Sequence, residues 1–128
     1  MNHLLWNMNA RIKNGYSARK LKISQPKSKL CAKMLKVFYK EGFIKNFRQN
    51  PTNPNPFDIF LKYINGNPII TQLDSVSTPS VKVYINAQDL CKLHNGVNTL
   101  VLSTTKGFLT DTQCKKLRLG GVIFCKIK

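Results

Sequence analysis

Near its carboxyl end the chain reads Val-Leu-Ser-Thr-Thr-Lys-Gly over residues 101–107, and Thr110-Asp111 and Gly120-Gly121 follow. An apolar run ends there in three hydroxyl side chains, a lysine and a glycine. A strand holds such an edge rigid, and a glycine lets the backbone bend closely around a ligand. The pattern predicts a polar edge that binds a ligand through hydrogen bonds.

The charge of the chain indicates what kind of ligand this is. Its 128 residues carry 21 Lys and Arg against 5 Asp and Glu, a formal net charge of +16. The charge is +11 over residues 1–50, zero over 51–100 and +5 over 101–128. Self-repulsion makes this excess costly unless a polyanion neutralises it, so nucleic acid is the first candidate partner.

Other kinds of partner are disfavoured. The longest apolar runs are strand-sized, far short of the roughly 18 residues of a membrane span, so we expect no membrane partner. The 4 cysteines form no Cys-x-x-Cys pair, and Cys91 with His94 is the only pair at metal-ligand spacing. One pair does not complete a tetrahedral zinc site. We therefore expect no metal and no cofactor, and buried free thiols in a reducing compartment.

An enzyme is also disfavoured. Residues 103–107 superficially resemble a phosphate-binding loop, which instead has glycines before the lysine and a Ser or Thr after it. A nucleophilic serine would need a base and an orienting acid, and the chain offers 2 histidines and 5 scattered acids. We expect no catalysis and no small-molecule substrate. The alternative to ligand binding is that the hydroxyls satisfy the backbone of a turn.

The first half of the chain alternates between helical and strand patterns. A helix is expected over residues 3–13, ending near Asn14-Gly15, and a second from the N-cap Ser28 to the C′ residue Gly42. Strands are expected over 20–24, 43–47, 57–63 and 68–73, with a loop over 49–56 and a hairpin turn at Asn65-Gly66. The lysines of the second helix form either a solvated face or a phosphate-binding one.

The second half is expected to be richer in strands. Residues 75–80 are the expected domain boundary, and strands follow over 81–85, 99–102 and 122–127. One helical turn is expected near 86–95, and a helix over 110–117 with Thr110 and Gln113 at capping-box spacing. The sequence thus predicts an α/β (α+β) fold. It has a small α/β domain over 1–74 and a mostly antiparallel β domain with a short helix over 75–128.

Six motifs stand in order along the chain: Arg11-Ile-Lys-Asn-Gly15, Pro26-Lys-Ser-Lys-Leu30, Glu41-Gly-Phe-Ile44, Leu61-Lys-Tyr63, Leu102–Asp111 and Gly120–Cys125. Together they resemble the universal family of the small-ribosomal-subunit protein numbered eight, the S-eight family. The resemblance runs from about Leu4 to the last residue, so we expect no cleaved presequence. The chain departs from the family at Val122, where an acid is usual, and at 78–80, where Arg-Pro-Gly is usual.

The resemblance implies a ribosomal protein that binds an irregular stem in the central domain of small-subunit rRNA, beside neighbouring small-subunit proteins, and supports subunit assembly. Carried onto this chain, the RNA-binding residues are Arg11, Asn14, Ser28, Lys29, Lys82, Tyr84, Ser103, Thr104, Thr105, Lys106, Gly107, Gly120 and Gly121. A free-standing RNA-binding translational regulator is the alternative. Many Asn, Ile and Lys residues suggest an A+T-rich coding sequence, so we expect the mitochondrial matrix, with another organelle or the bacterial cytoplasm as alternatives.

Overall fold

The computed structural model describes residues 3–26, 28–49, 56–77, 80–92 and 98–128. The chain forms two compact units, Asn2–Thr71 and Gln72–Lys128, which we describe separately. Most of the expected loop (residues 50–55), the Thr78-Pro79 pair of the expected boundary, and His94 lie outside the described residues.

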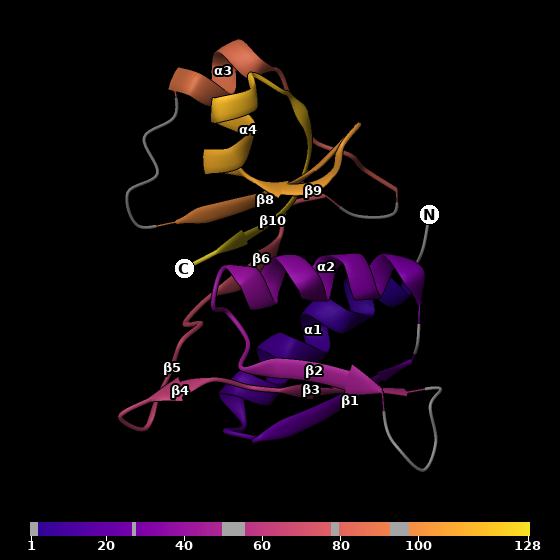
Figure 1. The fold of residues 1–128 in the computed structure, drawn as a ribbon, viewed down its shortest axis with the longest axis vertical. Helices are drawn as coiled ribbons and strands as arrows, with labels where there is room; N and C mark the ends of the chain where they lie inside the picture. Colours follow the sequence, from indigo (N-terminus) through magenta and orange to yellow (C-terminus); the bar gives the residue numbers. More distant parts are fainter. Residues whose placement is uncertain (1–2, 27, 50–55, 78–79, 93–97) are drawn as a thin grey trace. The chain divides into compact units, whose positions relative to one another are not determined.

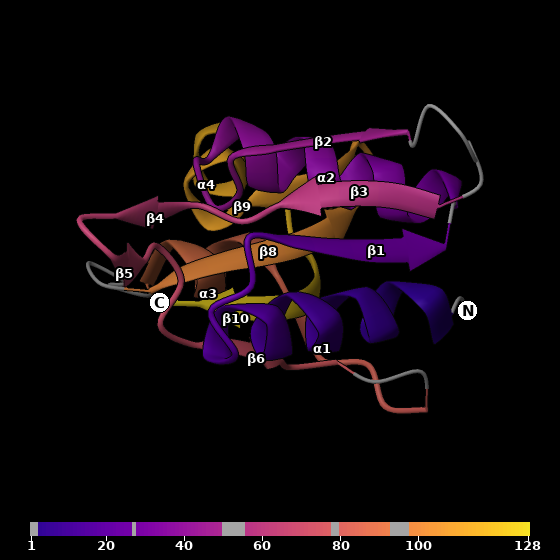
Figure 2. The same ribbon diagram turned by 90° about the horizontal axis from the view of Figure 1, so that it is seen from below.

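The amino-terminal unit is a three-stranded antiparallel sheet with two helices on one face (Figures 1 and 2). Its elements are α1 (His3–Ser17), β1 (Lys22–Pro26), α2 (Lys29–Lys40), β2 (Asn46–Gln49), β3 (Pro56–Phe60), β4 (Tyr63–Ile64) and β5 (Asn67–Pro68). The strand order is β1-β3-β2, and β4 pairs with β5. The core lies between helices and sheet, where Met8, Phe38 and Ile59 are completely buried.

Helix α1 confirms the expected first helix but extends beyond its expected end. Gly15 lies inside the helix, at a position that has no room for a side chain. A Cβ atom there would lie 2.8 Å from Cγ2 of Ile23 on β1. The chain leaves the helix only at Arg19, which has a positive φ of 55°. The Lys20 amide then donates to the Gly15 carbonyl at 2.9 Å, which closes the last turn. The glycine therefore serves packing rather than termination.

Helix α2 confirms its expected limits and its apolar face. Ser28 occupies the N-cap position, although its side chain makes no capping hydrogen bond, and Gly42, with φ +79°, is the C′ residue. The Phe43 amide donates to the Phe38 carbonyl at 2.8 Å, as in a Schellman motif. Because Phe43 closes the helix in this way, the strand expected over 43–47 was placed too early, and β2 begins at Asn46. Strand β1 is likewise displaced by two residues from the expected 20–24.

The carboxy-terminal unit is an antiparallel sheet carrying two short helices on one face. Its elements are β6 (Leu73–Ser75), β7 (Tyr84–Ile85), α3 (Ala87–Lys92), β8 (Thr99–Thr104), β9 (Gly107–Thr110), α4 (Asp111–Leu117) and β10 (Gly121–Ile127). The order is β6-β10-β8-β9, and β7 also pairs with β10. The helices cover a cluster of Leu90, Leu100, Leu102 and Cys114. The expected capping box of Thr110 and Gln113 is confirmed at the start of α4.

Three expected strands were wrong in extent. The strand expected over 57–63 is interrupted after Phe60, and β4 begins at Tyr63. The one expected over 68–73 is divided between β5, which closes the confirmed Asn65-Gly66 hairpin, and β6, which pairs with β10. Of 81–85 only β7 is strand, because the Val83 amide donates to the Ser77 hydroxyl at 3.0 Å.

The polar segment near 86–95 contains a six-residue helix, α3, rather than a single turn. The α+β fold class is confirmed by the mixture of helices and antiparallel sheets in the two units. In the part of the chain that the structure describes, no helix combines the length and the apolar character that crossing a membrane requires.

Candidate nucleic-acid interface

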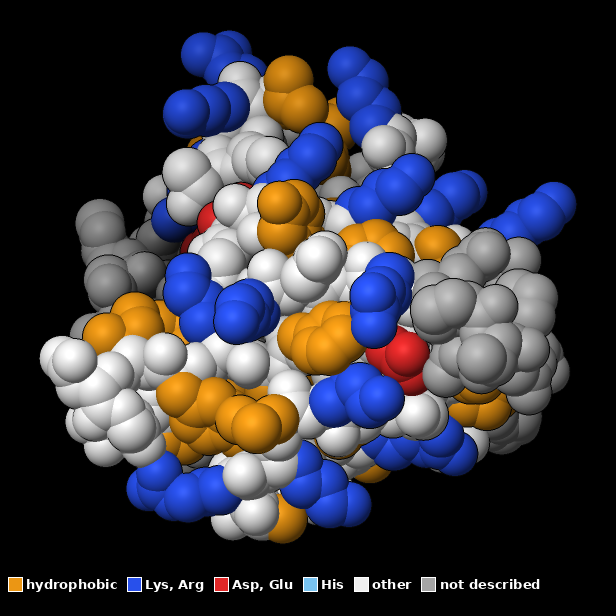
Figure 3. All heavy atoms as spheres, turned by 60° about the horizontal axis from the view of Figure 1, so that its bottom comes forward, with side chains coloured by type: hydrophobic (Ala, Val, Ile, Leu, Met, Phe, Trp, Pro, Cys, Tyr) orange, Lys and Arg blue, Asp and Glu red, His pale blue; other side chains and the backbone are white. Residues whose placement is uncertain are grey.

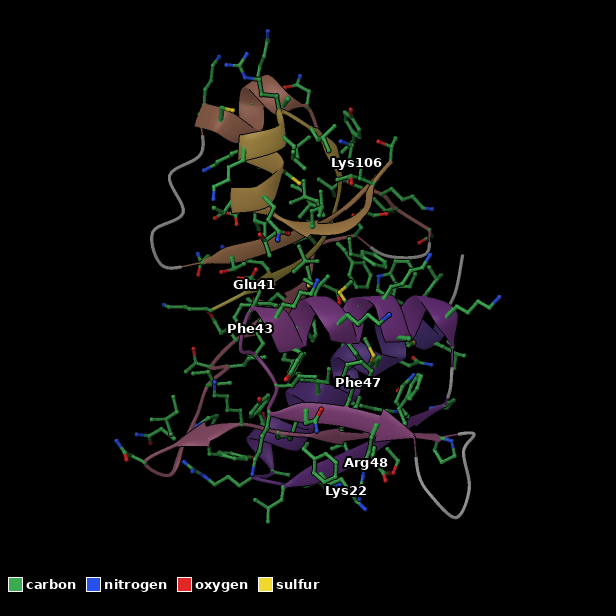
Figure 4. The ribbon with its side chains drawn as sticks, in the orientation of Figure 1. Lys22, Glu41, Phe43, Phe47, Arg48 and Lys106 are labelled. Carbon is green, nitrogen blue, oxygen red and sulfur yellow. The ribbon has the colours of Figure 1, made fainter. Side chains whose placement is uncertain are left out.

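The stretch 103–107 forms the tip of a β-hairpin, which we call the hairpin tip. Strands β8 and β9 pair up to Thr104 and Gly107, and Thr105-Lys106 form the turn between them. Gly107 has φ +99°, a conformation that side chains with a Cβ rarely adopt. Ser103, Thr105 and Lys106 are exposed, and Figure 4 shows Lys106 at the end of the hairpin.

The Thr104 hydroxyl is engaged within the turn. It donates to the Gly107 carbonyl at 2.8 Å and accepts from the Lys106 amide at 3.1 Å. For this residue the alternative interpretation applies, because the hydroxyl satisfies turn backbone and holds the tip in shape. The hydroxyls exposed at the tip are those of Ser103 and Thr105.

The paired glycines Gly120 and Gly121 let neighbouring strands approach one another closely. A Cβ at Gly121 would lie 2.4 Å from the Ser103 carbonyl oxygen, and one at Gly120 would lie 2.6 Å from the Ile85 carbonyl oxygen. Real Cβ atoms do not approach backbone this closely, so both sites require glycine. They allow β10 to approach the base of the hairpin tip on one side and the end of β7 on the other.

The pairing register places Tyr84, Val122, Ser103 and Phe108 in one row across β7, β10, β8 and β9. Directly paired residues of antiparallel strands project from the same face, and neighbouring strands lie about 4.8 Å apart. Tyr84 and Ser103 therefore share a face, roughly 10 Å apart. It is the face away from α3 and α4, because the next residues, Leu102 and Ile123, pack in the helix-covered cluster.

Tyr84 is 68% exposed, and Lys82 two residues earlier is exposed as well. The carboxy-terminal unit thus brings together a basic side chain, an aromatic ring and the exposed hydroxyls of the hairpin tip. Val122 lies between Tyr84 and Ser103 in the row, so an apolar side chain stands at the centre of this surface.

In the amino-terminal unit, Arg11 and Asn14 lie on exposed positions of α1. The Arg11 guanidinium donates to the Ser24 carbonyl of β1 at 2.9 Å. Both residues line a groove of about 550 Å³ beside β1, which Lys20 and Lys22 also line. These two lysines were missed as site residues, although the alternating pattern of 20–24 had placed them on one strand face.

Helix α2 carries the other amino-terminal candidates. Ser28 is its N-cap, and Lys29 is the first of four exposed lysines at intervals of four, three and four residues. Those intervals keep them along one side of a helix, away from the buried Met34 and Phe38. The structure therefore presents Arg11 with Asn14 in a groove, and Lys29 on a basic helix face.

The cysteines are free thiols, as expected. Cys31, Cys114 and Cys125 are buried, and burial raises the pKa of the Cys31 and Cys114 thiols. Cys91 is exposed on α3, so the expectation that it is buried was wrong. Among the described residues, no three His, Cys, Asp or Glu side chains gather where they could hold a metal ion.

The chain belongs to the ribosomal protein S8 family, whose family model matches residues 4–127. It is 38% identical to the small ribosomal subunit protein uS8c of Chlorella vulgaris, with 99% of each chain covered. It is 36% identical to the uS8 protein of Nitrosomonas europaea, with 94% of this chain and 92% of the relative covered. The uS8 protein of Caulobacter vibrioides is 38% identical, with coverage of 99% and 98%.

The resemblance to the S-eight family is therefore confirmed. Members of this family are structural ribosomal proteins, so the chain is a ribosomal protein and not an enzyme.

Proposed function

We propose that this chain is a structural constituent of the small ribosomal subunit that binds an irregular stem in the central domain of small-subunit rRNA. Its relatives are named small ribosomal subunit proteins, which supports the ribosomal role. The observation that carries the RNA-binding part is the hairpin tip. It exposes two hydroxyls and a lysine on a rigid turn, beside an exposed aromatic ring on the same sheet face.

Each part of this surface suits a different feature of RNA. Exposed hydroxyls and backbone amides hydrogen-bond to 2′-hydroxyls and splayed bases, and an aromatic ring stacks on a base. Lysines bind phosphates without reading sequence. We assign shape recognition to Ser103, Thr105 and Tyr84. Phosphate binding falls to Lys29, Lys82, Lys106 and the groove residue Arg11, with Asn14 and Ser28 hydrogen-bonding to the RNA backbone.

The remaining members of the set support the contact rather than make it. Thr104 and Gly107 hold the shape of the tip, and Gly120 and Gly121 let β10 lie against its base. We propose that the protein acts during subunit assembly by holding the distorted stem in one conformation, next to neighbouring small-subunit proteins. From the composition we further propose a mitochondrial matrix location, which fractionation of the source cells would check.

The test compares binding to the irregular central-domain stem with binding to a regular duplex of equal length. We expect Thr105→Ala to weaken binding to the irregular stem by about 1–2 kcal/mol, roughly 5- to 30-fold, and to leave the duplex unaffected. Lys29→Ala should weaken binding to both RNAs alike, since a phosphate contact carries no shape information. It should also make the slope of log affinity against log salt concentration shallower by about 0.7–0.9.

Thr112→Ala is the matched control, because this exposed threonine lies on α4, outside the proposed surface. If Thr105→Ala and Thr112→Ala behave alike on the irregular stem, the hairpin tip does not recognise its shape.

A salt-washed small subunit should retain the protein during sedimentation. Recovery only in the free fraction would instead indicate a free-standing regulator.

A further inference from the structure

The sheet of the amino-terminal unit has a second face, which none of the helices described in this unit covers (Figures 1 and 2). The residues Ile23, Ile59 and Phe47 form a row that faces α1 and α2, since Ile23 lies against Gly15 of α1. Alternate residues of a strand point to opposite sides. The other side, which we call the outer face, therefore carries Lys22, Phe60 and Asn46 in one row and Ser24, Asp58 and Arg48 in the next.

The figures agree with this alternation. Figure 4 shows Lys22 and Arg48 on the side of the sheet away from the helices, and Phe47 on the helix side. Figure 3, which turns this side forward, shows Lys and Arg side chains around apolar ones, with little acidic surface. The outer face is therefore a basic surface with an apolar centre.

An aromatic ring stands at that centre. Phe60 lies on β3, the middle strand, and is only partly buried. The Arg48 guanidinium lies over its ring, with Cζ 5.3 Å from the ring centroid. This cation–π contact covers one face of the ring in the free protein, so another flat group can stack there only when Arg48 moves aside. Lys22, paired with Phe60 in the register, is exposed beside it.

The charges of the outer face favour a nucleic acid over an acidic protein segment. Its exposed charged groups, Lys22 and Arg48, are positive, which suits phosphates. Its one acid, Asp58, is 2% exposed, and its Oδ1 atom has no hydrogen-bond partner among the described residues. Asp58 would repel a carboxylate and a phosphate alike, but the amino group of a base, unlike an acidic side chain, could donate to its Oδ1 atom once Arg48 moves aside.

We propose that the outer face binds an unpaired RNA segment, with one base stacked on Phe60 and adjacent phosphates on Lys22 and Arg48. Single strands bind proteins by this combination of stacking on aromatic rings and phosphate contacts on basic side chains. The base takes the position over the ring that Arg48 occupies in the free protein. The inference goes beyond the proposed function, because Phe60 and Arg48 belong neither to the stem-binding set nor to the groove beside Arg11, and the ligand is a single strand. Only Lys22 is shared with that groove.

The experiment titrates the full chain into a fluorescein-labelled oligoadenylate of eight nucleotides and follows anisotropy. Phe60→Leu keeps an apolar side chain but removes the stacking surface, so we expect affinity for the single strand to fall about 10-fold. Tyr39→Leu is the matched control, because Tyr39 is 54% exposed on α2, away from the outer face, and its loss should have no effect. Affinity for the irregular stem should stay within about twofold in both variants.

A measurement on the unaltered protein keeps the proposal testable even if Phe60→Leu does not fold. In NMR titrations with the same oligonucleotide, backbone amides of β1, β2 and β3 should shift first. Shifts confined to α2 or to the hairpin tip would overturn the proposal. So would equal single-strand affinity of Phe60→Leu and Tyr39→Leu, or a polyglutamate peptide that displaces the oligonucleotide from the same amides.

Lys22→Ala provides an electrostatic check. For single-strand binding, we expect it to make the slope of log affinity against log salt concentration shallower by about 0.7, while Lys92→Ala on α3 leaves this slope unchanged. If the wild-type chain binds the single strand but not the irregular stem, the proposed function is refuted and this inference is left intact. The reverse pattern would refute the inference alone.

Discussion

At the scale of single residues, Tyr16 links three segments of the amino-terminal unit. Its hydroxyl donates to the Phe43 carbonyl at 2.6 Å and accepts from the Lys62 amide at 3.0 Å. Its ring meets that of Tyr63 edge-on, with centroids 5.6 Å apart. Burial raises the pKa of Tyr16 to about 12, and the hydrogen bond from Lys62 opposes this rise only in part. The folded protein therefore holds this phenol in its neutral form.

A pH dependence follows from that shift. The unfolded chain releases the Tyr16 proton near pH 10, whereas the folded protein holds it until about pH 12. Stability from this group is complete below pH 10 and is lost as the pH rises to about 12. Tyr16→Phe should cost about 1–3 kcal/mol at pH 8, because the Phe43 carbonyl and Lys62 amide lose their partner.

The measurement is urea unfolding of both proteins from pH 8 to 11. The difference in free energy of unfolding between wild type and Tyr16→Phe should narrow above pH 10. Tyr39→Phe, at an exposed position, should match the wild type throughout. A difference that does not change with pH would show that the phenol is not held neutral by the fold.

At the scale of secondary structure elements, the approach of β10 to β8 depends on Gly121. Alanine there places a Cβ 2.4 Å from the Ser103 carbonyl oxygen, so one strand must shift. We expect Gly121→Ala to destabilise the chain by about 2–3 kcal/mol, as in overpacked cores, and to move the hairpin tip. The Cβ atom of Gly107→Ala would have no atom within 4 Å, so the only cost is the positive φ of this residue. It should cost roughly 1 kcal/mol.

The two variants are compared by urea unfolding and by amide chemical shifts of β8. Shifts in β8 for Gly121→Ala, together with the greater loss of stability, would support the close approach. Equal effects of the two substitutions would show that β10 and β8 separate easily and that the glycine is not needed there.

At the scale of the whole molecule, we propose that the two compact units are independent domains. The expected boundary between residues 74 and 75 lies inside β6, while the units divide between Thr71 and Gln72. The difference matters because Leu73 is 2% exposed and pairs with Ile127 of β10. The Gln72 backbone also exchanges two hydrogen bonds with Lys128.

Two fragments test this division. Residues 72–128 should fold alone, and residues 75–128 should be less stable by about 2 kcal/mol or more, because they lack the buried Leu73 and most of β6. Circular dichroism during urea unfolding checks both. A fragment 72–128 without a cooperative transition would show that the units are not separate domains. Equal midpoints for the two fragments would show that β6 adds no stability.

Several local features of this molecule were predicted correctly from the sequence because neighbouring residues specify them. The apolar face of α2, the Thr110–Gln113 capping box and the Asn65-Gly66 turn each depend on side chains a few positions apart. The six motifs also identified the family, whereas the polyanion partner predicted from the composition stays a prediction. The same holds at the candidate interface, where exposure of Thr105 and Lys106 follows from a polar turn between two strands.

What could not be predicted depends on residues distant in the chain. The Asn14-Gly15 pair predicts a helix end, but Gly15 lies inside α1, where Ile23 of β1 packs against it. Thr104 reads as an exposed hydroxyl, yet its engagement depends on how the turn closes. The outer face of the amino-terminal sheet was not recognised, because Lys22, Phe60 and Arg48 come together only through the pairing of β1, β3 and β2.

Local pattern and composition therefore indicated the type of most elements, though not all of their limits, together with the charge and the family, since each is a property of short stretches or of the chain as a sum. Apart from the β4–β5 hairpin, the partners of the strands were settled only by folding. Strand β6 pairs with β10 rather than with its neighbours in sequence, and Tyr84 shares a face with Ser103 through β10. A strand's hydrogen-bonding edges are alike whatever its side chains, so its partner is selected by which core the whole chain can bury.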